Sequence, residues 1–386
     1  MVKNHLEPRI HLAISLLLGF TKGMIPFMKK LIRGLGIFAG IIVGLVVLLL
    51  ILDALPVAPG GFRGKNPLRL ESGQIPHIIP HGGAKDLFPE NTIYSYQEMY
   101  RRGWNTFEVD LVLTKDGILI SHHDLGIGRT TGLDNDMVRD FTYNQLSRYN
   151  FAATFENLQG EKPYEHITWE NDPEMAAILI PARLSDLFRW YPDSYFILEL
   201  KDTIEKVGSD WAAQAVNALI DTIRDFSMED RVVVASFDSG VTAKFRAASE
   251  NTIPTAAGTN DVLIFSVLDA LWLDFFLPTP YTSLFLPIKD QIYPRERRIV
   301  ESLPQWLQNR LSVYDPTTDT LYTKLVTRSI IQAGHRKNLA VLYWTVNEPE
   351  DMRWILELGA DGLVTDRPDL MTQVLREMGY SVPAVD

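Results

Sequence analysis

The sequence contains no cysteine and no Asn-x-Ser/Thr triplet. The first absence excludes disulfide bonds, thiolate nucleophiles and cysteine-ligated zinc sites. The second leaves no acceptor for N-linked glycosylation. The 386-residue chain does contain 46% hydrophobic and 10% aromatic residues. This is enough apolar surface for a large core, and it argues against extensive disorder.

Charge is missing altogether from residues 34–52, a run rich in Ile, Val and Leu. As a helix this run would be about 28 Å long, close to the roughly 30 Å of a bilayer's hydrocarbon core. A buried core helix would be shorter and would show a polar face. A cleaved signal peptide would have a shorter apolar run, followed by small residues. Residues 34–52 are therefore predicted to be a single transmembrane helix.

The residues before this run are basic. Only Glu7 opposes six positive charges, on Lys3, Arg9, Lys22, Lys29, Lys30 and Arg33. Because positive flanks remain in the cytoplasm, residues 1–33 are predicted to be cytoplasmic, and the body to lie on the extracytoplasmic side of the cell membrane. The whole chain has a formal net charge of −11, so the body is acidic and a nucleic-acid partner is not expected. Residues 53–75, rich in glycine and proline, are expected to be a linker.

Residues 76–378 alternate short apolar strands with amphipathic helices. The predicted strands are His77–Pro80, Asn105–Val112, Gly117–His122, Ser194–Leu200, Arg231–Ser236, Ile253–Ala257, Leu339–Val346 and Gly362–Thr365. The predicted helices include Ile93–Arg102, Asp210–Phe226, Ser239–Ser249, Leu321–Arg336 and Pro349–Leu358. This alternation predicts an α/β fold, specifically a (β/α)8 TIM barrel. Ser283–Pro287 competes with Ile253–Ala257 for the sixth strand.

Two insertions interrupt this alternation. Residues 151–181 are polar and aromatic and follow the third strand, whereas residues 261–287 are strongly apolar. We expect the apolar insertion to be a core-packing helix followed by a loop. Alternatively, its side chains hold an acyl chain or enter the membrane interface. The side chains available for that role are Leu271, Trp272, Phe275 and Phe276.

Acidic residues occur on two of the predicted strands. Glu108 and Asp110 are two residues apart, so a strand points both toward the same side. Neighbouring buried carboxylates would repel one another and take up protons unless a cation joined them. Glu199 lies on the fourth strand, two residues before Lys201, which can meet a phosphate oxygen. Hard oxygen ligands favour one divalent cation, Ca²⁺ or Mg²⁺. The alternatives are an exposed acidic edge and a strand-end salt bridge.

Histidines lie at the ends of two predicted strands. His81 follows the first strand, and His122 and His123 end the third. Since neighbouring residues of a strand face opposite ways, only one of the last two can face the site. A histidine from each strand, meeting across the barrel mouth, would form an acid/base pair that works near neutral pH.

The polar motifs follow one another in a specific order. They are HGG…PENT, FEVDLVLTKDG, HHD, LELK, ASF, YWTVNEPEDM and LGADGLVTDRPD. As a set, from about Ile78 to Leu370, they resemble the glycerophosphodiester phosphodiesterase family. The resemblance implies a TIM barrel that uses a divalent cation to hydrolyse glycerol-linked phosphodiesters. The products would be an alcohol and glycerol phosphate, and lysophospholipids would be an equivalent substrate.

The resemblance also implies a role for each matching residue. The catalytic pair would be His81, as the base, and His123, as the acid. The metal ligands would be Glu108, Asp110 and Glu199. The residues around the substrate would be Lys201, Glu90, Asn91 and Trp344. Asp366 and Asn347 are interpreted as structural residues that tie strand ends to loops.

The sequence departs from the family's pattern at one position. The family usually has His-Arg-Gly where this chain has His81-Gly82-Gly83, and the missing arginine would hold phosphate bidentately. Lys85 and Arg129 are the candidates to replace it. Because of Gly82, a catalytically silent, membrane-anchored barrel that acts as a binding protein is the alternative function. A glycoside hydrolase would work with two carboxylates and would leave the histidines and Lys201 without a role.

Overall fold

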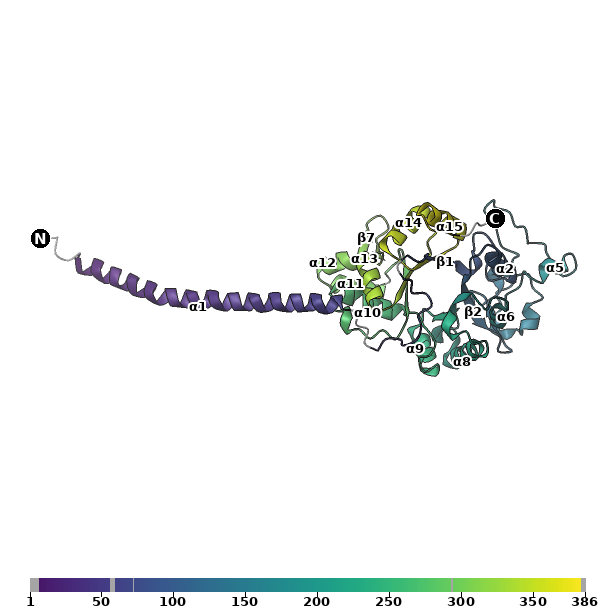
Figure 1. Cartoon of the computed structure of the whole chain (residues 1–386), viewed down its shortest axis with the longest axis horizontal. Helices are drawn as coiled ribbons and strands as arrows, with labels where there is room; N and C mark the ends of the chain where they lie inside the picture. The colour runs from purple at the N-terminus through teal and green to yellow at the C-terminus, as the bar shows by residue number, and fades with distance from the viewer. Residues whose placement is uncertain (1–6, 56–59, 72, 293, 383–386) are drawn as a thin grey trace. The chain divides into compact units, whose positions relative to one another are not determined.

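The structure is a computed structural model that describes residues 7–55, 60–71, 73–292 and 294–382. It divides into two compact units, residues 1–55 and residues 56–386. Figure 1 shows the helices and strands along the chain. All of the predicted site residues belong to the second unit.

The N-terminal unit is a single helix, α1 (Glu7–Ala54). Its stretch Met28–Leu52 has a mean hydropathy of 3.2, and none of it is buried inside the protein. By length and composition it is a candidate membrane span, which includes the predicted residues 34–52, although a signal sequence near the N-terminus would have the same properties. The helix also includes residues 7–33 of the predicted basic segment, and residues 1–6 lie outside the described residues.

The second unit contains two four-stranded sheets. Their strands are β1 (His77–Pro80), β2 (Thr106–Leu113), β3 (Leu119–Ser121), β4 (Tyr195–Leu200), β5 (Val232–Ala235), β6 (Ser283–Pro287), β9 (Ala340–Trp344) and β10 (Gly362–Thr365). One sheet has the order β1-β10-β9-β6 and the other the order β3-β2-β4-β5. All neighbouring strands pair in parallel except β2 and β3. This is the mainly parallel arrangement expected of an α/β fold.

Residues 255–256 connect the two sheets. Thr255 makes a parallel bridge with Val234 of β5, and Ala256 makes one with Ser283 of β6. The prediction that Ile253–Ala257 and Ser283–Pro287 compete for one strand position was therefore wrong, because both contribute to the parallel series. Within the described residues, β1 and β2 share no backbone ladder.

The prediction of Gly117–His122 as a parallel barrel strand was also wrong. The observed β3 pairs antiparallel with β2, and Leu111 lies opposite Ser121. A parallel return would need a crossover of about a dozen residues, whereas only residues 114–118 separate the two strands. Gly117 supplies the left-handed conformation of this short turn, with φ of 77°. The segment therefore returns beside β2 as a hairpin.

The other helices lie between and after the strands. After α1 they are α2 (Ile93–Arg101), α3 (Gly128–Thr131), α4 (Tyr143–Leu146), α5 (Pro173–Ala176), α6 (Leu184–Trp190), α7 (Ile204–Val207), α8 (Ser209–Asp225), α9 (Ser239–Ala248), α10 (Thr259–Ala270), α11 (Pro294–Ser302), α12 (Gln305–Leu311), α13 (Arg328–Arg336), α14 (Pro349–Leu358) and α15 (Pro368–Glu377). Short 3₁₀ turns are η1 (His81–Gly83), η2 (Val138–Asp140), η3 (Glu229–Arg231) and η4 (Asp274–Phe276). The four predicted helices other than Leu321–Arg336 are thus observed within two residues of their predicted bounds.

The predicted helix Leu321–Arg336 is a strand followed by a shorter helix. β7 (Ser312–Asp315) and β8 (Thr320–Thr323) form an antiparallel hairpin. The helix α13 begins only at Arg328, because the Thr327 hydroxyl caps it by accepting a hydrogen bond from the backbone N–H of Ile330. The aromatic and β-branched residues just before this cap suit a strand better than a helix.

Buried apolar side chains from both sheets meet in one interior cluster. It consists of Leu68, Ile79, Ile197, Val233, Ala256, Ala340, Leu342 and Val364. Leu68 comes from the segment before β1, which Asn66 holds in place by donating hydrogen bonds to the carbonyls of Thr282 (2.7 Å) and Asn338 (2.8 Å). Thr282 directly precedes β6 and Asn338 lies two residues before β9, so Leu68 packs at the amino-terminal ends of the strands.

Acid should destabilise the fold through His77 at the start of β1. Burial is the largest cause that lowers the pKa of His77 from 6.5 to about 4, against the opposing charge of Asp361. The unfolded chain therefore takes up this proton first as the pH falls. The free energy of unfolding has its full value above pH 6.5, and it should fall by about 3 kcal/mol as the pH drops to about 4.

We expect His77→Gln to remove this part of the pH dependence in urea unfolding measured from pH 7.5 to pH 4. The matched control is His166→Gln, because the side chain of His166 is 91% exposed. An unchanged pH slope in His77→Gln would contradict the assignment.

Candidate active site

The candidate site lies at the carboxyl-terminal ends of the parallel strands. His81 follows β1, Glu199 is the residue before the end of β4, Trp344 ends β9, and Asp366 follows β10. Because the strands are parallel, these positions meet at one end of the sheets, which is where barrel enzymes carry their active sites. The end closed by Leu68 is the opposite one.

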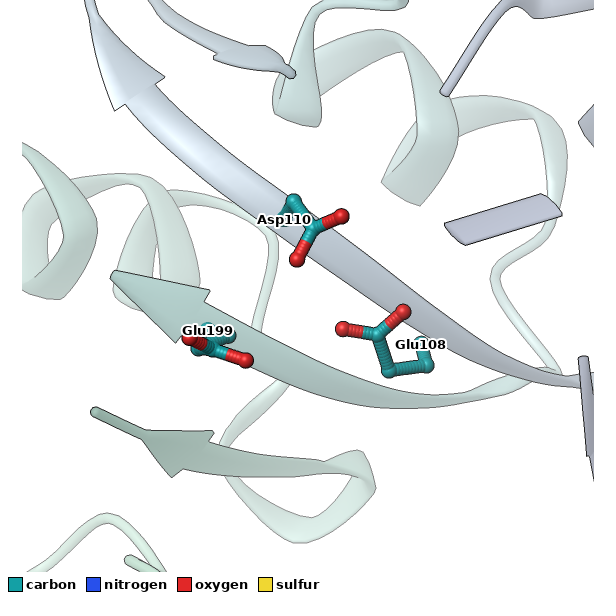
Figure 2. Close-up of side chains that lie close together, drawn as sticks. All are labelled: Glu108, Asp110 and Glu199. Carbon is teal, nitrogen blue, oxygen red and sulfur yellow. The ribbon is translucent and has the colours of Figure 1, made fainter. Parts of the chain in front are cut away.

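The three predicted metal ligands lie together on two neighbouring strands. Glu108 and Asp110 project from β2 and Glu199 from β4, as Figure 2 shows. Asp110 and Glu199 are direct partners in the β2–β4 register, and one oxygen of each carboxylate lies within 4.8 Å of the others. The spacing of Glu108 and Asp110 thus places both carboxylates on one face, as the sequence predicted.

Burial sets the charge of the two β2 carboxylates. Burial, followed by repulsion from Asp110, raises the pKa of Glu108. Burial would also raise the pKa of Asp110, but the ammonium groups of Lys201 and Lys85 outweigh it and lower that pKa. The nearby His123 contributes in the same direction. Asp110 therefore loses its proton more readily than Glu108.

Asp110 is the most heavily contacted of the three carboxylates. Its Oδ2 accepts a hydrogen bond of 2.8 Å from the Asn91 amide, and its Oδ1 lies 2.9 Å from the Lys201 ammonium. Lys201 also donates to Glu199 Oε1 at 2.6 Å. The amide of Asn91 is fixed in turn by Tyr96, whose hydroxyl donates to Asn91 Oδ1 at 3.0 Å. Lys201 and Asn91 therefore lie beside the carboxylates, as predicted for residues around the substrate.

Glu108 has a different environment. Its Oε2 accepts a hydrogen bond of 2.6 Å from the backbone N–H of Gly82, and among the described residues no cationic side chain forms an ion pair with it. A buried carboxylate without a cationic partner is costly unless a cation is bound. With hard oxygen donors from three carboxylates, the cluster of Glu108, Asp110 and Glu199 fits a divalent cation such as Ca²⁺ or Mg²⁺.

His81 is oriented by residues from the far end of the sequence. Its Nδ1 lies 2.8 Å from Asp366 Oδ1, and Asn347 donates to Asp366 Oδ2 at 2.8 Å. Burial disfavours protonation of His81, but Asp366 and Glu108 outweigh it and raise its pKa. Since a carboxylate only accepts, Nδ1 carries a hydrogen and Nε2 points the other way, 3.1 Å from Lys85 Nζ.

His123 has a carboxylate partner of its own. Its Nδ1 lies 2.8 Å from Asp124 Oδ1. Asp124 is held by Arg129, whose Nε donates at 2.5 Å, and the same guanidinium donates to both carboxylate oxygens of Glu90 at 2.6 and 2.9 Å. Arg129 is therefore engaged by two carboxylates, which leaves Lys85 as the stronger candidate for the missing phosphate-binding cation. Glu90 supports the site through Arg129.

The structure separates the two adjacent histidines. His122 is buried, lies 3.1 Å from the carbonyl of Gly126 and packs edge to face against Phe151. Burial lowers its pKa, so it remains neutral. His123 is partly exposed. Only His123 is therefore placed to exchange protons with a ligand, which agrees with the expectation that one of the pair faces the site.

Trp344 lies at the carboxyl end of β9 and contacts Phe237, the second residue after β5. Its ring packs edge to face against Phe237, with centroids 5.3 Å apart. Phe237 is exposed, and its ring lies 5.9 Å from Lys201 Nζ. These two rings therefore form an aromatic surface beside the carboxylate cluster, consistent with the predicted position of Trp344.

The first insertion contributes to a cavity beside the site. The cavity has a volume of about 320 Å³ and is lined by Lys85, Pro89, Glu90, Arg129, Thr130, Phe151, Thr154 and Phe155. Phe151, Thr154 and Phe155 belong to residues 151–181. This insertion therefore forms one wall of the site.

The second insertion lies elsewhere. It forms α10, η4 and β6, and Phe265 and Phe275 are buried in it while Trp272 and Phe276 are exposed. Because η4 precedes β6, it lies near the amino-terminal end of that strand, away from the carboxylates. The insertion is thus mainly core-packing, and its exposed aromatic residues are not beside the site.

Sequence reasoning overlooked the residues that orient the histidines. It interpreted Asp366 and Asn347 as residues that tie strand ends to loops, and Asn347 does accept hydrogen bonds from Thr365 and Asp366 at the end of β10. What it missed is that Asp366 also contacts His81 and that Asn347 donates to Asp366. It also gave no role to Asp124, although the HHD motif places this carboxylate next to His123. For Asp124 the available signal was its position directly after His123, whereas Asp366 is 285 residues from His81 and had no local signal.

Comparisons with known proteins agree with one another. The model of the glycerophosphoryl diester phosphodiesterase family matches residues 81–264 and 279–370. The glycerophosphodiester phosphodiesterase of Bacillus altitudinis is 28% identical over 303 residues, which cover 78% of this chain and 98% of that protein. Lysophospholipase D GDPD3 of Mus musculus is 22% identical over 314 residues, which cover 77% of this chain and 81% of that protein.

A solved structure shows the same fold. The glycerophosphoryl diester phosphodiesterase domain of a Mycobacterium tuberculosis protein superimposes with a TM-score of 0.58 at 17% identity. The match covers 79% of this chain and 100% of that chain. The body therefore has the TIM-barrel type of α/β fold.

Proposed function

We propose a function on the basis that the chain belongs to the glycerophosphoryl diester phosphodiesterase family. It is a phosphoric diester hydrolase, and we infer that it cleaves a glycerol-linked phosphodiester to an alcohol and glycerol phosphate. The observation that carries this inference is the arrangement around the carboxylates. Two histidines, each oriented by its own aspartate, accompany a three-carboxylate cluster at one end of the strands.

The cation is held by Glu108, Asp110 and Glu199. When bound, a divalent cation neutralises charge on the phosphate and helps to orient it. Asn91 fixes the position of Asp110, and the backbone N–H of Gly82 fixes that of Glu108. Lys201 bridges Asp110 and Glu199 and brings a positive charge to the same place. We assign Lys201 to binding of the phosphate.

His81 acts as the base. With its Nδ1 hydrogen directed to Asp366, Nε2 is the atom that takes the proton of the attacking hydroxyl, once Lys85 no longer donates to it. That hydroxyl belongs either to water or to the glycerol part of the substrate. The raised pKa of His81 keeps it basic near neutral pH. Asp366 stabilises the imidazolium that forms.

His123 acts as the acid. Asp124 orients its ring by accepting from Nδ1, so Nε2 is the atom that gives a proton to the leaving alcohol oxygen. Arg129 holds Asp124 and Glu90 together, so the acid is positioned at the edge of the 320 Å³ cavity that both Glu90 and Arg129 line. We assign that cavity to one part of the substrate and the aromatic surface of Trp344 and Phe237, beside Lys201, to another.

We also propose how the barrel closes and how the chain is placed in the membrane. The parallel segments are β1, β2, β4, β5, residues 255–256, β6, β9 and β10, and we propose that they close into an eight-stranded barrel. We further propose that α1 is a single-pass anchor in the cell membrane, with residues 1–33 as its cytoplasmic side and residues 76–378 as an extracytoplasmic catalytic domain. The apolar stretch and the basic residues before it support this orientation. Of the predicted linker, residues 53–75, the part with Asn66 and Leu68 packs against this domain and belongs to it.

A lysophospholipid is a second candidate substrate. The similarity to a protein named lysophospholipase D favours it. The alternative of a catalytically silent binding protein is not favoured, because both histidines, their aspartate partners and all three carboxylates are present and in contact distance of their partners.

Alcohol release by the full-length chain in detergent tests the proposal. The substrates are glycerophosphocholine, glycerophosphoethanolamine and lysophosphatidylcholine, each with Ca²⁺, with Mg²⁺ or with EDTA. We expect turnover that EDTA abolishes and that one of the two cations restores. Turnover that is unaffected by EDTA would contradict the role of the carboxylates, and a folded chain without turnover on any diester would contradict the enzymatic proposal.

A further inference from the structure

Lys85 fills the space that a side chain at position 82 would need. A Cβ atom on Gly82 would lie 2.3 Å from Lys85 Cε and 3.1 Å from Lys85 Nζ. It would also lie 3.2 Å from the amide nitrogen of Asn91, which holds Asp110. Because real Cβ atoms do not approach neighbours this closely, the absence of a side chain at 82 and the position of Lys85 depend on each other.

The Lys85 ammonium lies between the base and the carboxylates. Its Nζ is 3.1 Å from His81 Nε2 and 3.6 Å from Asp110 Oδ2, and its side chain is 17% exposed. Lys85 also lines the 320 Å³ cavity that includes Phe151 and Phe155. The charge is therefore directed toward the part of the site that is open to a ligand.

The three positively charged side chains near the carboxylate cluster differ in how many protein groups contact them. Arg129 makes short contacts with Glu90 and Asp124, and Lys201 makes short contacts with Glu199 and Asp110. Lys85 has three N–H donors, and among the described residues its one hydrogen-bonding partner is His81. Its remaining donors are available to an anion that enters from the cavity.

We propose that Lys85 is a phosphate-binding residue of the site and that Gly82 is present in order to admit it. The Lys85 ammonium donates to a non-bridging oxygen of the phosphodiester and provides a point charge opposite Lys201. This inference rests on the proposed function for the identity of the substrate. It also explains how His81 is held before substrate binds, since an ammonium only donates and Nε2 therefore remains an acceptor.

Phosphate binding provides a test that does not depend on turnover. The full-length chain, loaded with the cation that supports activity, is titrated calorimetrically with inorganic phosphate and with glycerol phosphate. Lys85→Met retains the unbranched stem but lacks the charge. We expect it to weaken the binding of both anions by about tenfold to a hundredfold, because it removes a charge-assisted hydrogen bond. The matched control is Lys115→Met on the exposed β2–β3 turn, with binding unchanged.

A titration with the cation alone separates phosphate binding from support of the carboxylates. We expect Lys85→Met to leave the affinity for the cation within about twofold of the parent value. Equal losses of cation and anion affinity would overturn the proposal, and so would unchanged anion affinity or a parent chain that binds neither anion. If Lys85-dependent anion binding were found without any diester hydrolysis, the proposed function would fail and the role of Lys85 would remain.

The shared space is tested by thermal stability. Gly82→Ala and Lys85→Ser are made singly and together. Residue 82 has φ of 49°, so Gly82→Ala carries a conformational cost in any background. The steric cost, however, should disappear when Lys85 is shortened. We expect Gly82→Ala to lower the melting temperature less in the Lys85→Ser background than in the parent chain. Equal decreases in the two backgrounds would contradict the link between positions 82 and 85.

Discussion

Replacing His123 with alanine is expected to lower kcat by about 10²- to 10⁴-fold, which is the usual contribution of a positioned acid or base. His123 is the acid in the proposed mechanism, and its orientation comes from Asp124 at 2.8 Å. The substrate's phosphate is held by other groups, so KM should change much less than kcat. The measurement is steady-state alcohol release from the preferred diester at saturating cation.

The control for this prediction is His166→Ala, which removes an exposed histidine distant in sequence from the motifs. It should leave kcat unchanged. Asp124→Asn tests the orienting role separately, because the asparagine side chain is of similar size but is uncharged and does not stabilise an imidazolium. A His123→Ala variant that retains the parent kcat would show that the acid is another group. In that case the role assigned to Asp124 would fail as well.

Replacing Glu108 with glutamine is expected to change function and stability in opposite directions. Even a residue that only supports a metal ligand typically contributes about 10- to 100-fold to metal affinity, so loss of a ligand should cost at least about 100-fold. Activity at limiting cation should fall in parallel. Glu108 is buried next to Asp110, and burial and repulsion together raise its pKa. A neutral side chain removes that repulsion, and the cation-free protein should therefore melt at a higher temperature.

Calorimetric titration with Ca²⁺ and Mg²⁺ gives the affinity, and thermal unfolding in EDTA gives the stability. Glu156→Gln is the matched control, because Glu156 is exposed on the first insertion. It should alter neither quantity. Unchanged cation affinity in Glu108→Gln would remove this residue from the ligand set, whereas a lower melting temperature in EDTA would mean that its hydrogen bond from Gly82 outweighs the repulsion.

The placement of Glu108 and Asp110 together could be predicted because it depends only on their spacing in the sequence. Glu108 and Asp110 share a strand, and two-residue spacing alone places them on one face. The orientation of His81 could not be predicted in this way. Its partner Asp366 is 285 residues away, and only the pairing of β1 with β10 brings the two together. Contacts of this kind depend on topology, which local pattern does not specify.

The error at β3 was one of strand pairing, whereas the β8 segment was predicted to begin the helix Leu321–Arg336. β3 was assigned to the regular β/α alternation, yet it returns beside β2 through a short turn. Hydrophobic pattern identifies an extended segment but does not identify its neighbour. The length of the connection does, because a few residues permit only an antiparallel return. For β3, the five residues from 114 to 118 were sufficient information.

The segment that carries Asn66 and Leu68 determines how molecules reach the site. Leu68 is fully buried at the amino-terminal ends of the strands, so within the described residues this end of the interior is filled by side chains. Substrate and both products must use the same opening at the carboxyl-terminal end. An alcohol that stays in the cavity beside Phe155 therefore blocks the next substrate, and the enzyme should show inhibition by its own alcohol product that is competitive with the diester.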